Sequence, residues 1–176
     1  NMDVWRPCDT AESLVAWAEV AKAKYHPSCL IFSRQNLKFQ ARSEQQLNDI
    51  KRGGYVISEA QGNAQAVIIA TGSEVELALE AQKALAAQNI AVRVVSMPST
   101  NVFDRQDAAY KAAVLPEGLP RVAVEAGHAD IWYKYVGLNG AVVGLNRFGE
   151  SAPAELLFKE FGFTVDNVVD TVKSVL

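Results

Sequence analysis

The chain has 176 residues, of which 49% are hydrophobic and 21% charged. This composition is ordinary for a globular protein that buries its own core. The formal net charge of −3 argues against non-specific nucleic-acid binding, and no apolar run is long enough to cross a bilayer. Cys8 and Cys29 could form one disulfide, but two thiols beside a large core are more typical of a reduced, cytoplasmic protein. The few histidines and cysteines are not clustered, which argues against a zinc site.

The first part of the chain predicts a strand, a helix and a second strand. Residues 4–8 form a short strand, and Asp9 with Glu12 is then placed to form a capping box. Pro27 ends the helical element, and the apolar residues 29–32 form the second strand, which gives a βαβ unit. Apolar side chains recur at helical spacing and predict one common face of the helix: Leu14, Trp17, Ala18, Ala21 and Tyr25.

A change of composition predicts a boundary between two domains. Residues 37–52 are polar and poor in β-branched side chains, and Gly53-Gly54 breaks the chain after them. We interpret residues 41–54 as a partly helical linker that separates a domain over 1–40 from a domain over 55–176.

The second domain begins with two strands and a helix in clear order. Residues 55–57 predict an edge strand, and the continuous apolar run 66–70 is typical of a parallel strand covered on both faces. Ser73 and Glu76 are placed to form a second capping box. The helix that follows, over 74–87, should bury one stripe and end at Asn89: Leu77, Ala81, Ala84 and Leu85.

The rest of the chain alternates strands and helices. The predicted elements are strand 92–96, a helix over 104–113, strands 121–125 and 141–145, a helix opened by Ser151 and ended at Gly162, and a last helix capped by Thr164. Val165, Val168, Val169, Val172 and Leu176 make one stripe on the last helix.

Arg34 is the strongest candidate for a binding residue. It lies just past the apolar stretch 28–32, at the edge of the sheet where open α/β folds bind their ligands. Its guanidinium offers a fixed fork of donors for a phosphate or carboxylate. From position alone, however, a surface arginine that covers the sheet edge is the more common case.

A turn at a helix start is a weaker candidate. Thr71-Gly72-Ser73 joins a strand to a helix, and free amide groups at such a start can hold an anion. Glu74 and Glu76 already place negative charge in the first helical turn, which favours a plain capped turn over a phosphate site.

Two further groups favour structural roles. Glu125, His128 and Asp130 could support acid/base chemistry. No nucleophile or metal partner is evident, so a hydrogen-bonded loop or a subunit contact is favoured. Base stacking by an aromatic group would need more positive charge than Lys134 supplies, so core or interface packing is favoured for that group: Trp132, Tyr133 and Tyr135.

Several stretches, in the same order, closely resemble the last quarter of bacterial-type transketolases. They are residues 5–9, 33–37, 52–56, 70–78, 93–100, 133–137 and 148–153. This resemblance implies that residues 1–40 end a pyrimidine-binding domain. It also implies that residues 55–176 form the family's C-terminal domain, an α/β fold with three α/β/α layers around a mixed, mainly parallel sheet.

The resemblance carries specific expectations about function. Transketolases are homodimers that use thiamine diphosphate and a divalent cation, Mg or Ca, to move a two-carbon ketol unit between sugar phosphates of the pentose phosphate pathway. The cofactor carries the bond-breaking chemistry. The family's phosphate-binding arginine maps onto Arg34. No catalytic, cofactor-binding or metal-binding residue maps onto this chain, and His26 and His128 do not match the family's catalytic histidines.

The sequence therefore predicts a C-terminal fragment of a transketolase, inactive alone, that supplies phosphate binding and dimer support alongside the remainder of its chain. The first residue, Asn1, is not a methionine, which suggests a fragment, although an expression-tag remnant gives the same appearance. Nucleic acid and membranes are not expected partners. The alternative is a free-standing module of the same fold that binds a small anion or assembles with another chain. A half-domain exposes the sheet edge it left behind, so residues 1–35 of a fragment should be the least stable part or should associate.

Overall fold

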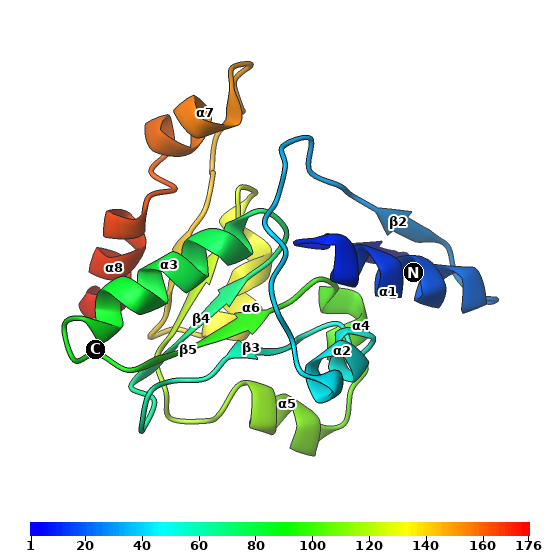
Figure 1. The fold of residues 1–176 in the computed structure, drawn as a ribbon, viewed down its shortest axis with the longest axis horizontal. Coiled ribbons are helices and arrows are strands. Elements are labelled where there is room, and N and C mark those ends of the chain that lie inside the picture. The colour runs from blue at the N-terminus through cyan, green and yellow to red at the C-terminus, as the bar shows by residue number, and fades with distance from the viewer.

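The structure is a computed structural model that describes all 176 residues, with a small N-terminal unit beside a larger C-terminal unit (Figure 1). The N-terminal unit consists of β1 (Asp3–Trp5), α1 (Thr10–Lys22) and β2 (Ser28–Leu30). β1 and β2 pair in parallel, with Val4 opposite Cys29. The predicted βαβ unit is therefore confirmed.

The connecting segment contains one short helix. This helix, α2 (Glu44–Ile50), begins at a capping box in which Ser43 and Gln46 exchange hydrogen bonds. The Gln46 side chain also donates to the carbonyl groups of Val56 and Ile57, at 2.9 and 3.0 Å. The segment is partly helical, as predicted, and it is hydrogen-bonded to the first strand of the C-terminal unit.

A mixed five-stranded sheet forms the centre of the C-terminal unit. Its strands lie in the order β3-β5-β4-β6-β7, with β3 antiparallel to β5 and all other pairs parallel. The mainly parallel sheet with an edge strand at its start is therefore confirmed. The strands are β3 (Tyr55–Ser58), β4 (Ala66–Ala70), β5 (Val92–Ser96), β6 (Arg121–Val124) and β7 (Ala141–Val143).

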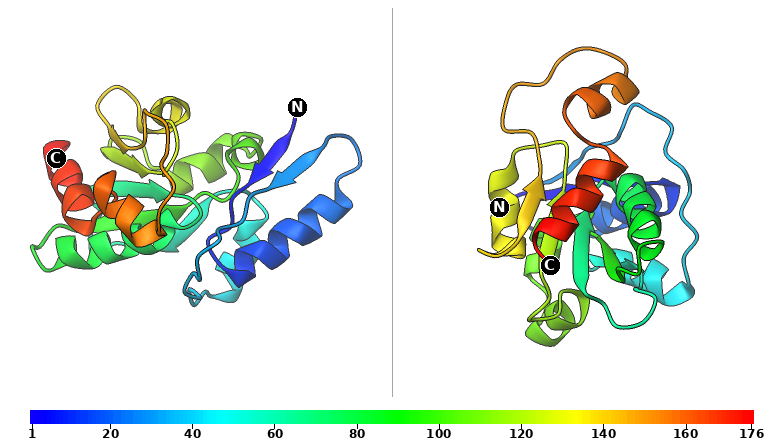
Figure 2. Two further views of the ribbon diagram at one scale, coloured as in Figure 1. Left: turned by 90° about the horizontal axis from the view of Figure 1, so that it is seen from above. Right: turned by 90° about the vertical axis from the view of Figure 1, so that its left-hand side faces the viewer.

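Helices cover both faces of this sheet. Alternate residues of β4 serve the two faces: Ile68 packs in a core with α3 and α8, whereas Val67 and Ile69 pack in a second core with the helices of the opposite face. Figure 2 shows α3 in green beside α8 in red. The helices are α3 (Glu74–Ala86), α4 (Thr100–Asp104), α5 (Ala108–Val114), the 3₁₀ helix η1 (Ala129–Trp132), α6 (Tyr133–Val136), α7 (Ala154–Glu160) and α8 (Val165–Ser174). No helix is long and apolar enough to cross a membrane.

Helix α1 does not bury the face that its sequence predicts. Leu14 is 72% exposed, Trp17 56% and Tyr25 93%, whereas Glu12 and Ala16 are fully buried. Ala16 packs in a small core with Trp5 and Val102, and the Glu12 carboxylate is held by hydrogen bonds. The helix is oriented by a buried charge, and its larger apolar side chains are left on the surface.

Other boundaries differ from the predictions for local reasons. Ser73 makes no capping hydrogen bond to the α3 backbone, because its own backbone is already helical (φ −60°, ψ −23°) and not extended as at a capping residue; its hydroxyl donates to the Glu74 carboxylate at 2.6 Å. The helix predicted over 104–113 is two helices, since Asp107 caps a new one by accepting from the amide of Tyr110. Pro153, rather than Ser151, occupies the N-cap position of α7.

The predicted cap at Thr164 and the predicted helix end at Asn89 are confirmed. Thr164 caps α8 by accepting from the amide of Asn167 at 3.2 Å. Asn89, just past the end of α3, has a positive φ of 60°, a conformation that asparagine tolerates better than most residues.

Candidate functional site

The loop that follows β2 carries the predicted anion-binding arginine. Its start is fixed, because the amide of Ile31 donates to the carbonyl of Trp5 at 2.8 Å and so continues the β1–β2 pairing. Arg34 lies in a bend of this loop and is exposed. No side chain or backbone group of the chain pairs with its guanidinium, so all five donors are free to meet an anion.

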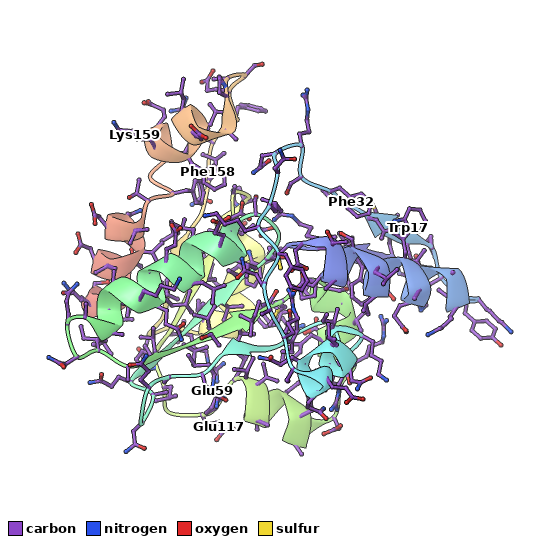
Figure 3. All side chains as sticks on the ribbon, in the orientation of Figure 1. Trp17, Phe32, Glu59, Glu117, Phe158 and Lys159 are labelled. Carbon is purple, nitrogen blue, oxygen red and sulfur yellow. The ribbon has the colours of Figure 1, made fainter.

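Two hollows lie beside this loop. The first, about 250 Å³, is lined by the loop residues Ser33 and Gln35, by Arg6 and Gly72, and by the α7 residue Phe158. The second, about 460 Å³, lies between Gln35, Asn36 and Leu37 of the loop and the starts of α3, α7 and α8. Phe158 lies between α7 and α3 (Figure 3) and lines both hollows. The loop therefore forms one wall of a cleft whose other walls belong to the C-terminal unit.

Arg6 joins the N-terminal unit to the carboxyl ends of two sheet strands. Its guanidinium donates to Glu125, which directly follows β6, and to Glu74 at 3.2 Å, at the start of the helix after β4. The Arg6 carbonyl accepts from the amide of Gly72 at 3.0 Å, and its amide donates to the carbonyl of Pro98 at 2.7 Å. Both the side chain and the backbone of Arg6 are therefore held by the C-terminal unit.

The two carboxylates that meet Arg6 are buried and otherwise satisfied. Glu125 also accepts from the indole N–H of Trp132, and Glu74 accepts from the hydroxyl of Ser73. Burial raises the pKa of Glu74 above its ordinary value, and the positive charge of Arg6 opposes that rise. Arg6 is the one cation paired with these two acids, and its charge stabilises the ionised form of Glu74.

A second, fully buried network lies between α1, the connecting segment and the sheet. The Arg42 side chain is 0% exposed and donates to Asp9 Oδ2 at 2.6 Å and to Tyr55 Oη at 2.7 Å. Tyr55 in turn donates to Glu12 Oε1 at 2.8 Å, and Ser96 donates to the same oxygen at 2.6 Å. These direct contacts tie three separate parts of the chain together.

The burial of this network changes the acidity of its members. Burial and the nearby Glu12 carboxylate raise the pKa of the Tyr55 hydroxyl, so Tyr55 stays a hydrogen-bond donor. Burial likewise raises the pKa of the Cys8 thiol, which lies 3.3 Å from an Arg42 nitrogen. Cys8 is therefore an inert packing residue rather than a nucleophile. Burial opposes the charge of Arg42, but its hydrogen bonds to Asp9 and Tyr55 keep its pKa above the ordinary value.

A third arginine fixes the other end of the N-terminal unit. Arg105, just after α4, makes a bidentate pair with Asp3 at 2.7 and 2.6 Å. The hydrogen bonds from Arg105 hold the pKa of Asp3 below its ordinary value. The ring of His26 approaches the same carboxylate, with Nδ1 at 3.4 Å. The start of β1 is thereby held against α4.

The other sequence candidates do not form a catalytic group. Glu125 is buried beside Trp132, whereas His128 and Asp130 are exposed and pair with each other at 3.4 Å. Leu145 donates its amide to the carbonyl of Gly127 at 2.8 Å, so the segment is a hydrogen-bonded loop, as favoured above. Trp132 and Tyr135 lie in the core, and Tyr133 is exposed.

The turn at Gly72 holds a cation rather than an anion. A Cβ added to Gly72, whose φ is +56°, would lie 3.3 Å from an Arg6 nitrogen. The sequence favoured a plain turn over a phosphate site at residues 71–73. In the structure this turn contacts Arg6 of the N-terminal unit. The prediction missed this role of Arg6 and the buried roles of Glu12 and Arg42. The polar linker around Arg42 carries no pattern that marks it as buried, and the capping-box position of Glu12 was the only local signal for that residue.

The chain offers no place for a resident metal ion. No group of three or more histidine, cysteine, aspartate or glutamate side chains gathers where it could hold one. Glu74 and Glu125, the acids just past the ends of β4 and β6, are already paired with Arg6. The residues of this chain therefore do not fit a metal-bound diphosphate cofactor.

Comparison with known proteins gives a consistent family assignment. The family model described as "Transketolase-like TK C-terminal domain" matches residues 53–164. Transketolase 1 of Escherichia coli K12 is 60% identical over 177 residues, which cover 100% of this chain and 27% of that protein. The chain therefore spans about a quarter of the length of the curated relatives it matches.

Solved structures agree with the sequence comparison. A transketolase from Leishmania mexicana superimposes with a TM-score of 0.91 at 43% identity, covering 99% of this chain and 25% of that one. A transketolase from Pichia stipitis in complex with sedoheptulose 7-phosphate gives a TM-score of 0.90 at 39% identity, with the same coverage. The expected α/β fold is confirmed over nearly the whole chain.

Proposed function

Because the chain belongs to the transketolase family, we propose that it is the C-terminal part of an enzyme that transfers a two-carbon ketol unit from a ketose phosphate to an aldose phosphate. In this proposal residues 1–40 complete a pyrimidine-binding domain, residues 41–54 connect it to the next domain, and residues 55–176 are the C-terminal domain. The part described here binds the terminal phosphate of the substrate through Arg34 and supports a homodimer.

The free guanidinium of Arg34 is the observation that carries this proposal. It is the charged end of an exposed side chain on a loop whose start is fixed to β1, and no carboxylate of the chain neutralises it. A planar fork of donors matches the oxygens of a phosphate. The Pichia stipitis relative in complex with a sugar phosphate supports the same ligand class.

Phosphate binding at Arg34 would assist catalysis at a distance. Binding energy from a part of the substrate that does not react can be used to align the carbons that do react. Thiamine diphosphate and a divalent cation, held elsewhere in the enzyme, would supply the carbanion-stabilising chemistry. This chain contributes no acid, base or cofactor contact in the proposal, and so it should be inactive alone.

An exposed apolar face supports the place of this chain in a larger protein. The rings of Trp17 and Phe32 stack on the surface of the N-terminal unit, with 6.4 Å between their centroids (Figure 3). Leu14 is also exposed on α1. The sheet beside them has only two strands. A contiguous apolar surface of this kind marks a contact, and the remainder of the pyrimidine-binding domain would cover it.

The test replaces Arg34 with alanine in the full-length enzyme. We expect the KM for phosphorylated ketoses to rise by about 10-fold to 100-fold, the scale of a lost charge-assisted contact. The KM for a short unphosphorylated ketol donor should change little, because that donor never reaches Arg34. Steady-state kinetics with the two donors measures the ratio directly.

The matched control is Arg147→Ala, which removes another exposed arginine, one paired with Glu150 at 2.9 Å. It should leave both KM values unchanged. Equal effects of Arg34→Ala on the phosphorylated and unphosphorylated donors would refute the role given to Arg34. Ketol transfer by the 176-residue chain alone, with cofactor and metal added, would refute the proposal that catalysis resides elsewhere.

A further inference from the structure

The carboxyl ends of β4 and β6 form the crevice where a sheet of this topology would bind a ligand. From β4 the chain crosses through α3 to β5 on one side, and the later strand β6 lies on the other side. The connections therefore diverge between β4 and β6. Open α/β sheets bind their ligands outside the strand ends at such a switch point. Gly72 and Glu125 lie there, each within two residues of the end of its strand.

A side chain from the N-terminal unit already fills this crevice. The Arg6 guanidinium donates to Glu74 and Glu125 on the two sides of the switch point and lies over Gly72. It is partly exposed, with the adjoining hollow of about 250 Å³ giving solvent a path to it. The crevice is built for a planar cation with several donors, since its two acids are buried and lack any other cation.

The same arginine is directly coupled to the loop that carries Arg34. Trp5, its neighbour along the chain, accepts the hydrogen bond from Ile31 that fixes the start of that loop. Arg6 and the loop residue Ser33 line one hollow. The Arg6 side chain and the start of the Arg34 loop are therefore linked through Trp5 and through one shared hollow, so loss of the side-chain contacts should loosen the end of β1 and the loop paired with it.

We propose that Arg6 is an internal guanidinium ligand of the switch-point crevice and that, by occupying it, Arg6 positions the Arg34 loop for the substrate phosphate. Arg6 is thus a positioning residue, not a catalytic one. The positioning of the phosphate loop rests on the proposed function of Arg34, whereas the occupation of the crevice does not.

The experiment is chemical rescue of Arg6→Ala in the full-length enzyme. The substitution leaves a hollow lined by two acids, into which free guanidinium fits. We expect kcat/KM for a phosphorylated ketose to fall by about 10-fold to 100-fold, as for a misplaced binding group. Millimolar guanidinium chloride should restore part of the loss, and sodium chloride at equal concentration should restore none. Arg6→Lys should be intermediate, because an ammonium keeps the charge without the fork.

Amide hydrogen exchange gives a readout that needs no catalysis. In Arg6→Ala the amides of residues 28–37 should exchange faster than in the wild type, and guanidinium should slow them again. The matched control is Arg93→Ala, which removes an arginine with a two-bond contact to Glu59, at 3.0 and 3.1 Å, near the opposite ends of the strands. Glu59 lies in the lower part of the molecule in Figure 3, above Glu117. This control should leave exchange in residues 28–37 unchanged.

The outcomes separate this inference from the function on which it rests. Unchanged exchange in Arg6→Ala, or a loss that guanidinium and sodium restore equally, overturns the guanidinium site. If Arg34→Ala is selective for phosphorylated donors but Arg6→Ala is not, the positioning role is wrong while the proposed function stands. If Arg34→Ala is not selective, the proposed function fails, and the exchange data still decide whether Arg6 occupies the crevice. Should Arg6→Ala not fold, Arg6→Lys with the same two readouts decides the matter.

Discussion

Removal of Arg42 should destabilise the protein more than any exposed arginine would. Arg42→Ala takes the cation from a network in which the side chains of Arg42 and Glu12 are 0% exposed and that of Asp9 is 1% exposed. Breaking a buried ion pair by removing one partner costs about 3–5 kcal/mol, because the remaining charge is left uncompensated. Here two carboxylates lose the same partner.

The remaining hydrogen bonds place the cost toward the lower half of that range. Asp9 keeps the backbone amides of Glu12 and Gln40, at 3.1 and 2.9 Å. Glu12 keeps the amide of Cys8 and the Tyr55 hydroxyl, at 2.7 and 2.8 Å. We therefore expect a loss of about 3–4 kcal/mol. For a chain of this length, that corresponds to a fall in Tm of about 10 °C.

Urea unfolding at neutral pH, followed by circular dichroism, measures the loss. Arg147→Ala is the control, because Arg147 and Glu150 are both more than half exposed and such pairs contribute about 1 kcal/mol or less. Arg42→Met separates charge from packing, since methionine keeps most of the apolar stem. A loss in Arg42→Ala no larger than in Arg147→Ala, or full stability in Arg42→Met, would refute the reasoning.

Two further substitutions test other contacts. The Asp3 pKa is lowered in the folded state, so its stabilising effect is present above the unfolded pKa and is lost as the pH falls below about 4. Arg105→Gln should therefore cost most stability near neutral pH and progressively less in acid; a pH-independent deficit in urea unfolding would contradict this. Gly53→Ala should cost about 3 kcal/mol or more, because φ is +82° and the new Cβ would lie 2.4 Å from the Ser99 carbonyl oxygen. Gly62→Ala, also at positive φ but with nothing within 4 Å, should cost only about 1–2 kcal/mol, and equal losses in the two variants would exclude the close contact.

The central strands and α3 could be predicted because local and tertiary requirements agree there. Residues 66–70 are apolar throughout, and every one of them is buried, so no alternative face competes. The boundaries of β5, Val92–Ser96, are likewise the predicted ones. Helix α1 shows the reverse case. Its periodic apolar face is exposed, because the helix turns Glu12 into the core instead. The Glu12 carboxylate accepts hydrogen bonds there from Tyr55 and Ser96, which are 43 and 84 residues away in the sequence. Pattern analysis cannot weigh a partner so distant in sequence.

The candidate site divides in the same way. Arg34 could be proposed from its place after an apolar strand and from the family resemblance, both of which are local signals. Arg6 pairs with Glu74 and Glu125, 68 and 119 residues further along the chain. The residues around those two acids suggested a capped turn and a hydrogen-bonded loop; the loop was confirmed, whereas the cap at Ser73 was wrong. Their common function as partners of one guanidinium exists only after the sheet has formed.

Three arginines hold the N-terminal unit, which carries the Arg34 loop, against the C-terminal unit. Arg6 reaches from the N-terminal unit into the sheet, Arg105 reaches back to β1, and Arg42 joins both sides from the connecting segment. Each of these guanidinium groups makes at least two hydrogen bonds, which fixes its direction as well as its distance. Three such contacts spread along one boundary leave little freedom of rotation. In the proposal above, the loop with Arg34 is therefore oriented by arginines other than the one that binds the phosphate. If so, the selectivity for phosphorylated substrates should respond to Arg6, and it should be indifferent to changes at Glu117, beyond α5 on the far side of the C-terminal unit (Figure 3).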